Sequence, residues 1–323
     1  MPSANRLTGQ IEPLQDEADS ILITCASYED RSTAVALQLS ARYRTDHTLI
    51  FRSKEYAEKG TTPQNSRILY DRFGTICKSA PYLIEFCLDH SIPPLAEFER
   101  YCNELQSASA IKSVTVDITT FPRQELLMLL RVLDKLPTRP RIRLLYTEPE
   151  KYGTETVGGW LTRGVRCVRT IPGFGGVQPP SKNNLLIMFL GHEEERAAIT
   201  WKRHQPKKTV LMIPDPSYRG ELDGIVEKTH RPLFAKLSPT EFYPPISARG
   251  VDEAERAILE LWEKYHESYF LVVAPFGTKL QTLGIYNAVK QKRDIQITYA
   301  VPAVYNYNNF SAGVGPIWEV LWT

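Results

Sequence analysis

At 323 residues the chain is too long for one ordinary hydrophobic core, and it fits two domains of about 150 residues each. Its 39 basic and 37 acidic side chains give a formal net charge of +2, which excludes the global positive field that drives non-specific binding to a nucleic-acid duplex. Because the longest apolar runs, at residues 185–190 and 270–275, are far shorter than the roughly 20 residues that cross a bilayer, and the first 19 residues lack a secretory signal, we expect a cytoplasmic protein without membrane contact.

Strands alternate with helices in the first half of the chain. Apolar patterning predicts strands at residues 21–24, 48–51, 113–118 and 141–147, and helices at residues 34–39, 81–90, 96–106 and 122–136. This alternation implies βαβ units around a mainly parallel sheet. We therefore predict an N-terminal Rossmann-like domain over residues 1–171.

The densest group of helix and strand breakers in the chain lies between residues 171 and 184. It consists of Pro172, Gly173, Gly175, Gly176, Pro179 and Pro180. We place the linker between the two domains at residues 172–183. A functional loop that covers a ligand is the alternative interpretation.

The second half of the chain shows the same alternation of strands and helices. Strands are predicted at residues 185–190, 209–213, 270–274 and 295–301, and helices at 193–204, 219–229, 252–265 and 280–290. Residues 305–315 are rich in Tyr, Asn and Gly and predict a loop, and residues 317–322 are expected to close this second sheet as an antiparallel edge strand. The predicted fold class is therefore α/β, with two consecutive Rossmann-like domains that have mainly parallel sheets, the second over residues 184–323.

The five cysteines give no sign of a disulfide framework or a zinc site. They are odd in number, widely spaced and without a CxxC pair: Cys25, Cys77, Cys87, Cys102 and Cys167. Reduced and mostly buried thiols are expected. We predict no metal site, and no motif identifies a cofactor.

The turn after the predicted strand 270–274 has the features of an anion-binding site. Gly277 allows close approach of the backbone to a ligand, and Thr278 can cap the next helix or bond a phosphate oxygen. Lys279 adds a positive charge where the first amides of a helix already favour an anion. The GxxxxGK[ST] spacing of a P-loop is absent, so Walker-type hydrolysis is not expected. A glycine turn with a solvated lysine and a capping threonine is the alternative.

A second glycine turn follows the first strand of the same half. Gly191, His192 and Glu193 come directly after residues 185–190, and Asp215–Pro216–Ser217–Tyr218–Arg219 follows the next strand. Together with Gly277-Thr278-Lys279, this order resembles the CARF-like Rossmannoid domains that sense cyclic oligonucleotides in prokaryotic defence, over residues 184–301. The usual turn of that family has two glycines before Thr-Lys, whereas Phe276 takes the first place here.

The resemblance implies a ligand, a site and an assembly. It implies that Lys279 and Thr278 face the phosphates of a nucleotide or cyclic oligonucleotide, and that Gly191 and His192 line the opposite wall. It also implies a homodimer with the ligand on the two-fold axis, in antiviral defence, where a protein partner in a larger complex is possible. A surface histidine beside a run of glutamates is the alternative for His192.

Aromatic and amide side chains gather after the last predicted parallel strand. Among them are Tyr305 and Asn306, which we include in the predicted ligand site because such side chains can stack on and read a base. The group also contains Tyr299, Tyr307, Phe310, Asn308 and Asn309. A folded-over loop or a dimer contact explains the same residues equally well.

Two polar turns of the first half offer a possible catalytic site. They follow the strands 21–24 and 113–118 and contain the carboxylates Glu29, Asp30 and Asp117. Nearby hydroxyl and guanidinium groups come from Ser27, Thr119, Thr120, Arg31 and Arg123. A carboxylate in such a setting can act as general base or nucleophile on a nucleotide if burial raises its pKa. In the alternative, Asp117 and Thr120 cap the next helix and Arg31 pairs with Glu29.

Three functions remain open at this point. The first is a nucleotide-binding sensor, in which the C-terminal domain passes its ligand state to an N-terminal effector or catalytic domain. The second is a hydrolase or glycosyl transferase that acts on nucleotides through the N-terminal turns. The third is a non-catalytic adaptor in a larger complex.

Overall fold

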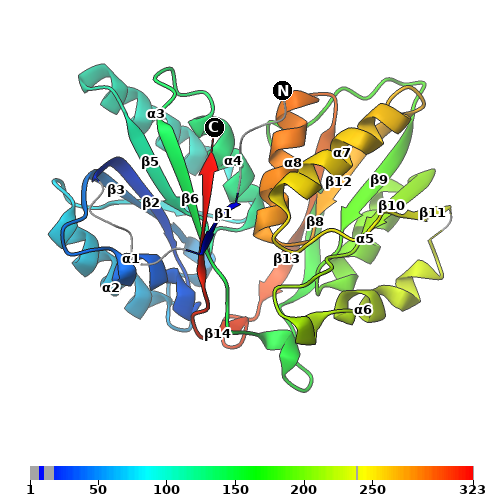
Figure 1. Cartoon of the computed structure of the whole chain (residues 1–323), viewed down its shortest axis with the longest axis horizontal. Coiled ribbons are helices and arrows are strands. Elements are labelled where there is room, and N and C mark those ends of the chain that lie inside the picture. The colour runs from blue at the N-terminus through cyan, green and yellow to red at the C-terminus, as the bar shows by residue number, and fades with distance from the viewer. Residues whose placement is uncertain (1–6, 11–17, 238, 323) are drawn as a thin grey trace. The chain divides into compact units, whose positions relative to one another are not determined.

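The structure is a computed structural model, and it describes residues 7–10, 18–237 and 239–322. The chain forms two compact units: unit 1 runs to Trp160 and resumes at Asn306, and unit 2 comprises Leu161–Tyr305. Each unit is built around one mainly parallel sheet (Figure 1). This confirms the predicted fold class of two Rossmann-like domains.

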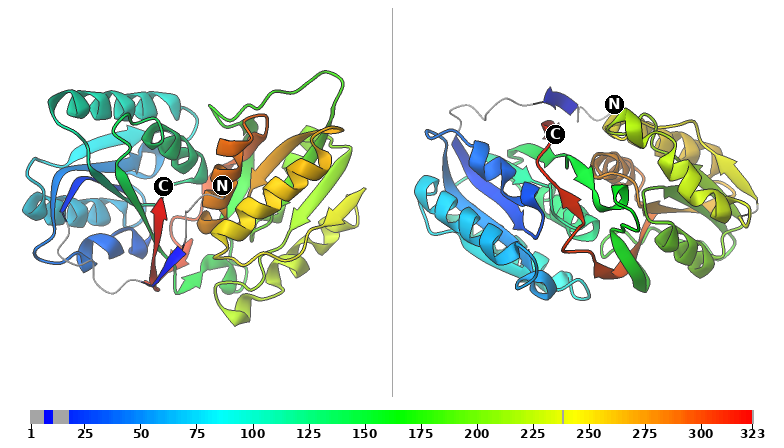
Figure 2. Two further views of the ribbon diagram at one scale, coloured as in Figure 1. Left: turned by 45° about the horizontal axis from the view of Figure 1, so that its top comes forward. Right: turned by 90° about the horizontal axis from the view of Figure 1, so that it is seen from below.

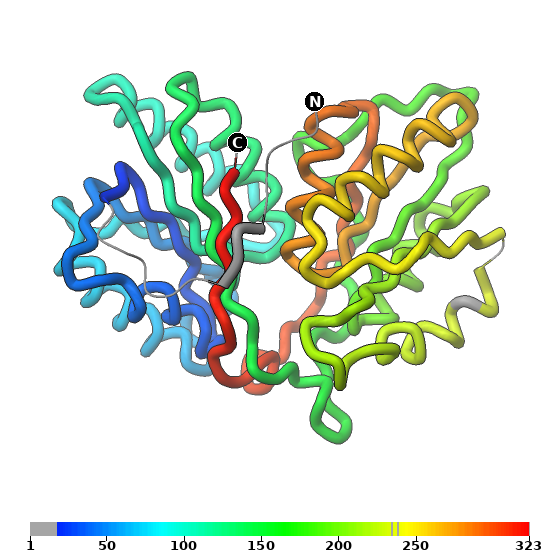
Figure 3. Tube along the Cα trace, in the orientation of Figure 1, coloured from blue at the N-terminus to red at the C-terminus, as the bar shows by residue number. Residues whose placement is uncertain are grey.

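The sheet of unit 1 contains five parallel strands, β2 (Ala18–Ala26), β3 (Arg44–Ser53), β4 (Tyr82–Phe86), β5 (Ser113–Asp117) and β6 (Arg141–Thr147). Their order in space is β4-β3-β2-β5-β6. Two strands extend it beyond β6: β15 (Ile317–Trp322) is antiparallel to β6, and β1 (Leu7–Gln10) is antiparallel to β15. Figure 3 traces the C-terminal segment as it runs back alongside β6.

Helices cover both faces of this sheet. The helices α1 (Ala34–Gln38) and α2 (Thr62–Ile76) pack on one face, in a core that includes Leu22, Ile50 and Phe73. The helices α3 (Ile92–Ala108) and α4 (Arg123–Leu133) lie on the other, where Phe98 meets Phe51 at a ring-centroid distance of 5.8 Å. Leu126, Leu127, Leu130 and Leu133 recur at helical spacing along α4, and all four are buried.

Unit 2 repeats the same plan. Its parallel strands are β9 (Asn183–Phe189), β10 (Lys208–Met212), β11 (Thr240–Phe242), β12 (Tyr269–Pro275) and β13 (Gln296–Tyr305), in the order β11-β10-β9-β12-β13. The strand β8 (Thr162–Thr170) pairs antiparallel with β13 at the edge. In both units the fourth parallel strand therefore lies beside the first, and the order of the strands reverses there.

Two pairs of helices enclose the sheet of unit 2 (Figure 2). The helices α5 (Glu194–His204) and α6 (Ile225–Phe234) share a core with one face. The helices α7 (Val251–Tyr265) and α8 (Lys279–Gln291) pack closely on each other, because Gly284 brings α8 onto the backbone of α7. A Cβ at Gly284 would lie 2.1 Å from the carbonyl oxygen of Val251. This contact holds the middle of α8 against the start of α7.

Short elements connect the larger ones. They are the 3-10 helices at Asp30–Ser32, Lys54–Tyr56, Gly153–Glu155 and Gly220–Leu222, and the small antiparallel pair of β7 (Lys151–Tyr152) and β14 (Ser311–Ala312). Within the described ranges, no helix is long and apolar enough to cross a membrane.

Several local predictions are wrong. Residues 81–90 contain the strand β4 rather than a helix, because Ile84 and Phe86 alternate with more exposed neighbours and pair with β3. The helix α2 lies where no element is predicted. Residues 317–322 do form an antiparallel strand, but β15 joins the sheet of unit 1, and β8 occupies the corresponding place in unit 2. The Gly/Pro segment 172–183 lies inside unit 2, after β8.

Candidate functional site

Two turns meet at the point of unit 2 where the strand order reverses. Gly191 follows β9, and Phe276 and Gly277 follow the neighbouring strand β12. The turns touch through the backbone, since a Cβ at Gly191 would lie 2.1 Å from the carbonyl oxygen of Phe276. The structure therefore brings the two predicted glycine turns together at the carboxyl edge of the sheet.

The helix α8 starts directly from the second of these turns. Thr278 is its N-cap: Oγ1 accepts a hydrogen bond from the Gln281 amide at 3.1 Å, and the Thr278 amide donates to Gln281 Oε1 at 3.1 Å. Thr278 Oγ1 also donates to the Ala248 carbonyl at 2.6 Å. The hydroxyl thus serves as a cap, as in the alternative interpretation of this turn. Lys279 is the first residue of α8 and is half-buried.

Phe276 stands where the CARF-like turn that this segment resembles has a glycine, and its side chain does not fill the turn. Its side chain is 1% exposed and belongs to the core that α5 and α6 share with the sheet. The guanidinium carbon of Arg196 lies 5.3 Å from the centre of its ring. The ring therefore points into the interior, and the backbone of the turn is all that Phe276 contributes at the edge.

Arg196 is a residue that the sequence analysis missed. Its side chain is 1% exposed. The guanidinium donates from Nη1 to Glu193 Oε2 at 2.7 Å and from Nε to the Ala300 carbonyl at 3.0 Å. Its central carbon lies 4.8 Å from the centre of the Tyr299 ring. Burial alone lowers the pKa of Arg196, but Glu193 and the tyrosines raise it above its ordinary value, so the guanidinium stays charged. Glu193 and Arg196 are three residues apart at the start of a predicted helix, and this spacing is typical of an ion pair.

The Gly191 turn is also held from the side of α6. His230 is fully buried, and its Nε2 donates to the Gly191 carbonyl at 2.8 Å. Burial lowers the pKa of His230, so the ring is neutral near pH 7. His192 lies half-buried in the next position of the turn, before the run of glutamates that opens α5.

The predicted base-reading segment is divided between the two units. Tyr305 ends β13 in unit 2, where its hydroxyl lies 3.4 Å from that of Tyr299. Asn306 belongs to unit 1, and its Nδ2 donates to the Trp160 carbonyl at 2.8 Å. Tyr307 and Phe310 likewise contact aromatic rings of unit 1.

In unit 1, Glu29 and Arg31 form a buried ion pair. Arg31 donates to Glu29 Oε2 from Nε at 2.9 Å and from Nη2 at 2.7 Å, and from Nη1 to the Thr147 carbonyl at 2.9 Å. Ser311 Oγ donates to the same Glu29 oxygen at 2.5 Å. With so many partners inside the protein, Glu29 holds the C-terminal segment on the sheet rather than facing solvent.

Asp117 ends β5 and is 3% exposed. Its Oδ1 accepts from the Thr119 amide at 3.0 Å, and its Oδ2 accepts from Thr24 Oγ1 at 3.4 Å. Burial raises the pKa of Asp117 to about 6, although these hydrogen bonds lower it. Asp30 is exposed, and its Oδ2 accepts from the Gly313 amide at 3.1 Å.

The remaining polar residues of these turns have local roles. The prediction of Thr120 as a helix N-cap is wrong, because Pro122 is the N-cap of α4 and Thr120 Oγ1 donates to the Cys25 carbonyl. In the part of the chain that the structure describes, no three His, Cys, Asp or Glu side chains gather as a group that could hold a metal ion.

Comparisons with known proteins identify a similar fold. No protein-family model matches the chain, and no curated protein matches it by sequence. A solved type III CRISPR defence DNA nuclease activated by cyclic oligoadenylate matches with a TM-score of 0.53 and 10% identity, over 88% of this chain and 65% of that one. Can2 from Sulfobacillus thermosulfidooxidans, solved with cyclic tetra-adenylate, matches with a TM-score of 0.29 and 16% identity, over 41% of this chain and 37% of that one. The likeness to the nuclease concerns the fold.

The match covers only part of each of those two proteins. It spans 65% of the nuclease chain and 37% of the Can2 chain in the matched regions. Activities that belong to the whole of either protein are therefore matters of proposal for this chain.

Proposed function

We propose that unit 2 is a sensor that binds a phosphate-bearing nucleotide of the cyclic oligonucleotide type through Gly191, His192, Gly277 and Lys279, while Thr278 caps α8 beside them. The contact between the Gly191 turn and the Phe276–Gly277 turn at the start of α8 carries the proposal. Ligands of open α/β sheets bind beyond the carboxyl ends of the strands at the point where strand order reverses, because helix N-termini and loops converge there.

The chemistry of this edge suits a phosphodiester. The start of a helix carries a partial positive charge and attracts anions, and Lys279 adds a full charge in its first turn. The charge of Arg196 is balanced by Glu193 in their 2.7 Å ion pair, so Arg196 adds no net charge to this edge. The glycines allow phosphate oxygens to approach the backbone.

Unit 1 is proposed as the part that responds to the ligand. The chain passes directly from Tyr305 at the end of β13 to a segment that is bound to unit 1, where Ser311 contacts Glu29 and Gly313 contacts Asp30. A shift at the end of β13 would therefore act on those contacts. The fold shared with a nuclease activated by cyclic oligoadenylate supports this ligand class and a role in prokaryotic antiviral defence. The homodimer is proposed only because the resemblance to CARF-like domains implies it.

The ligand proposal is tested by binding to the full chain. Isothermal titration and thermal melting with cyclic oligoadenylates of several ring sizes, their linear counterparts and AMP should give binding by a cyclic species. At a free concentration 100 times Kd, that species should stabilise the protein by about 2.7 kcal/mol. Lys279→Ala should weaken binding by about tenfold or more, which corresponds to about 1.4 kcal/mol.

Lys290→Ala is the matched control, because Lys290 is exposed in the last turn of the same helix. Equal loss of affinity in both variants, or no binding of any cyclic species, would refute the proposal. Sedimentation velocity with and without the bound species tests the homodimer separately. Phage challenge of cells that carry wild type or Lys279→Ala tests the defence role.

A nucleotide hydrolase or glycosyl transferase is the second candidate. Its supporting observation is Asp117, a buried carboxyl whose pKa is raised to about 6 at the point where strand order reverses in unit 1. A nucleotide panel analysed by chromatography should reveal turnover that is lost in Asp117→Asn. Turnover that survives this change would remove Asp117 from any catalytic role.

A further inference from the structure

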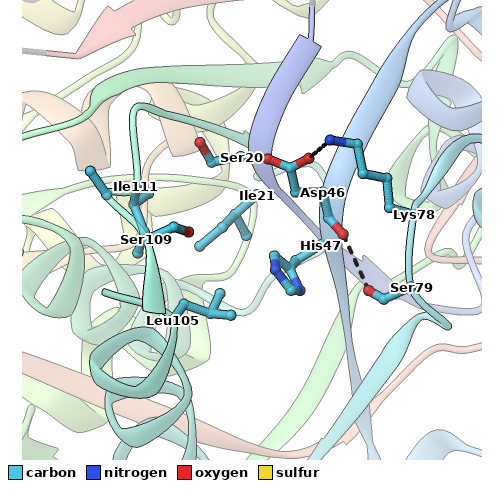
Figure 4. A pocket seen from close by; sticks show the side chains of 10 residues that line it. Ser20, Ile21, Asp46, His47, Lys78, Ser79, Leu105, Ser109 and Ile111 are labelled. Atoms are coloured by element: carbon cyan, nitrogen blue, oxygen red, sulfur yellow. Dashed lines mark hydrogen bonds and ion pairs between the residues drawn. The ribbon is translucent and has the colours of Figure 1, made fainter. Parts of the chain in front are cut away.

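Unit 1 has a pocket at the amino edge of its sheet, at the opposite end of the strands from Asp117. Its volume is about 370 Å³. The starts of β2 and β3 and the end of α3 line it (Figure 4). The lining residues are Ser20, Ile21, Asp46, His47, Lys78, Ser79, Leu105, Ser109, Ala110 and Ile111.

One side of the pocket is apolar. Ile21 is fully buried and Ile111 is 3% exposed, so they support the pocket from beneath, and the partly buried Leu105 of α3 supplies apolar surface that a ligand can reach. Figure 4 shows Ile21, Leu105 and the His47 ring directed toward the same space. Such a surface favours the flat apolar body of a small organic molecule over a fully hydrated ion.

The other side is rich in hydrogen-bond donors. Lys78 Nζ lies 2.5 Å from Asp46 Oδ1, and Ser79 Oγ donates to the Asp46 carbonyl at 3.2 Å. This pairing holds the ammonium group at the rim and raises the pKa of Lys78, chiefly through the hydrogen bond to Asp46. An ammonium group has three donors, so N–H groups remain for a second acceptor.

The His47 ring has one nitrogen engaged and one toward the pocket. Nδ1 lies 3.1 Å from the Tyr101 hydroxyl, and the two rings meet edge to face at 6.0 Å, which fixes the imidazole. Among the described residues, Nε2 has no hydrogen-bond partner. Ser20 Oγ accepts from the Lys112 amide at 3.0 Å, so its own proton is available to a ligand.

From these contacts we propose that the pocket binds a small aromatic carboxylate. The ring lies against Leu105 and the His47 imidazole, and the carboxylate accepts from Lys78 and from His47 Nε2 or the Ser20 hydroxyl. Donors outnumber acceptors here, because Asp46 is the one carboxylate of the lining and is already paired with Lys78. An anion is therefore favoured over a cation.

The volume fits a molecule of this size. A water molecule occupies about 30 Å³ in the liquid, so the pocket has room for roughly a dozen waters or for one substituted ring with its carboxylate. Known ligand pockets begin at about 300 Å³. All lining residues belong to unit 1, so a test of this pocket does not depend on whether unit 2 binds a nucleotide.

The test uses the full chain with 4-hydroxybenzoate as the probe and 4-hydroxybenzamide as its uncharged match, measured by ligand-observed NMR and isothermal titration. Wild type should bind the carboxylate at least about tenfold more tightly than the amide. Ala110→Trp should abolish binding, because Ala110 is an exposed residue of the lining and the larger side chain would occupy the pocket. Lys78→Met should weaken carboxylate binding by about tenfold and leave amide binding unchanged.

Ala108→Trp is the matched control, since Ala108 is exposed at the end of α3 and lies outside the lining. It should bind the probe like wild type. The proposal is overturned if wild type fails to bind the carboxylate at millimolar concentration, if the amide binds equally well, or if Ala110→Trp retains binding.

Discussion

Gly191 and Phe276 are in backbone contact across the carboxyl ends of two neighbouring strands, so close that a Cβ at Gly191 would lie 2.1 Å from the Phe276 carbonyl oxygen. The glycine is required by this approach, not by its backbone conformation, because no positive φ is present there. We expect Gly191→Ala to push the two turns apart. The free energy of unfolding should fall by about 1–3 kcal/mol, as at other overpacked sites. Ligand binding should also become weaker.

Chemical denaturation and titration with the nucleotide ligand measure both effects. Gly175→Ala is the control within unit 2, since a Cβ at Gly175 meets no atom within 4 Å. It should leave stability within about 0.5 kcal/mol of wild type. Equal stability of Gly191→Ala and Gly175→Ala would show that the two turns can separate freely.

Most of the fold was predictable from local pattern. Apolar runs identify the strands β9 and β12, and apolar residues at helical spacing identify the helices α4 and α7. Because strands and helices alternate along the chain, parallel sheets follow. The partners of β8 and β15 were not predictable, because a strand's neighbour depends on contacts far along the chain. Thr162 pairs with Tyr305, and Ile317 with Thr147.

Some residues of the candidate site could be predicted from local sequence, and others could not. Gly277, Thr278 and Lys279 form one continuous motif, so their place at a helix start could be predicted from sequence. For Arg196 the spacing from Glu193 could indicate an ion pair, but its packing on Phe276 and Tyr299 could not be predicted, because these rings follow β12 and lie in β13, far along the chain. Glu29 was predicted as a catalytic group because it lies in a polar turn. In the structure it is buried beside Arg31 and forms an ion pair with it.

The buried carboxyl of Asp117 should make stability depend on pH in an unusual direction. Its pKa is raised to about 6 in the folded protein, while an unfolded aspartate titrates near 3.9. Between these values the folded state binds the extra proton, so this group's contribution to stability falls as pH rises from 4 to 6 and stays low above. The difference between these two pKa values corresponds to roughly 3 kcal/mol in the free energy of unfolding.

Asp117→Asn isolates this contribution, because the amide stays uncharged and its oxygen can still accept from the Thr119 amide. Denaturant unfolding at pH 4, 5, 6 and 7 should give a difference between wild type and variant that moves in favour of the variant as pH rises. A difference that stays constant across this range would mean that Asp117 is not protonated in the folded protein below pH 6.

Two neighbouring threonines should respond in opposite ways to the same change. Thr147 Oγ1 is buried and has no hydrogen-bond partner among the described residues, whereas Thr119 Oγ1 accepts from the Thr147 amide at 3.0 Å. Thr147→Val should be neutral or stabilise by up to about 1 kcal/mol, because it removes an unpaired hydroxyl. Thr119→Val should destabilise by about 1–3 kcal/mol, because it leaves the Thr147 amide unpaired. Urea unfolding of both variants checks the contrast, and a costly Thr147→Val would mean that water or another group satisfies its hydroxyl.

Phe276 provides the final prediction, since it stands where the related turn has a glycine. Phe276→Gly should not improve ligand binding, because the ring is directed into the core and leaves the turn open. It should instead cost about 3–5 kcal/mol, the usual loss for a buried phenylalanine, and also remove the ring under Arg196. Phe276→Leu keeps an apolar side chain and loses the ring, so it should retain most of the stability but not the cation–π contact, worth about 0.5–2 kcal/mol. Thermal melting and ligand titration of the two variants separate these effects: tighter binding by Phe276→Gly would mean that the ring, and not only the backbone of this residue, limits access to the turn.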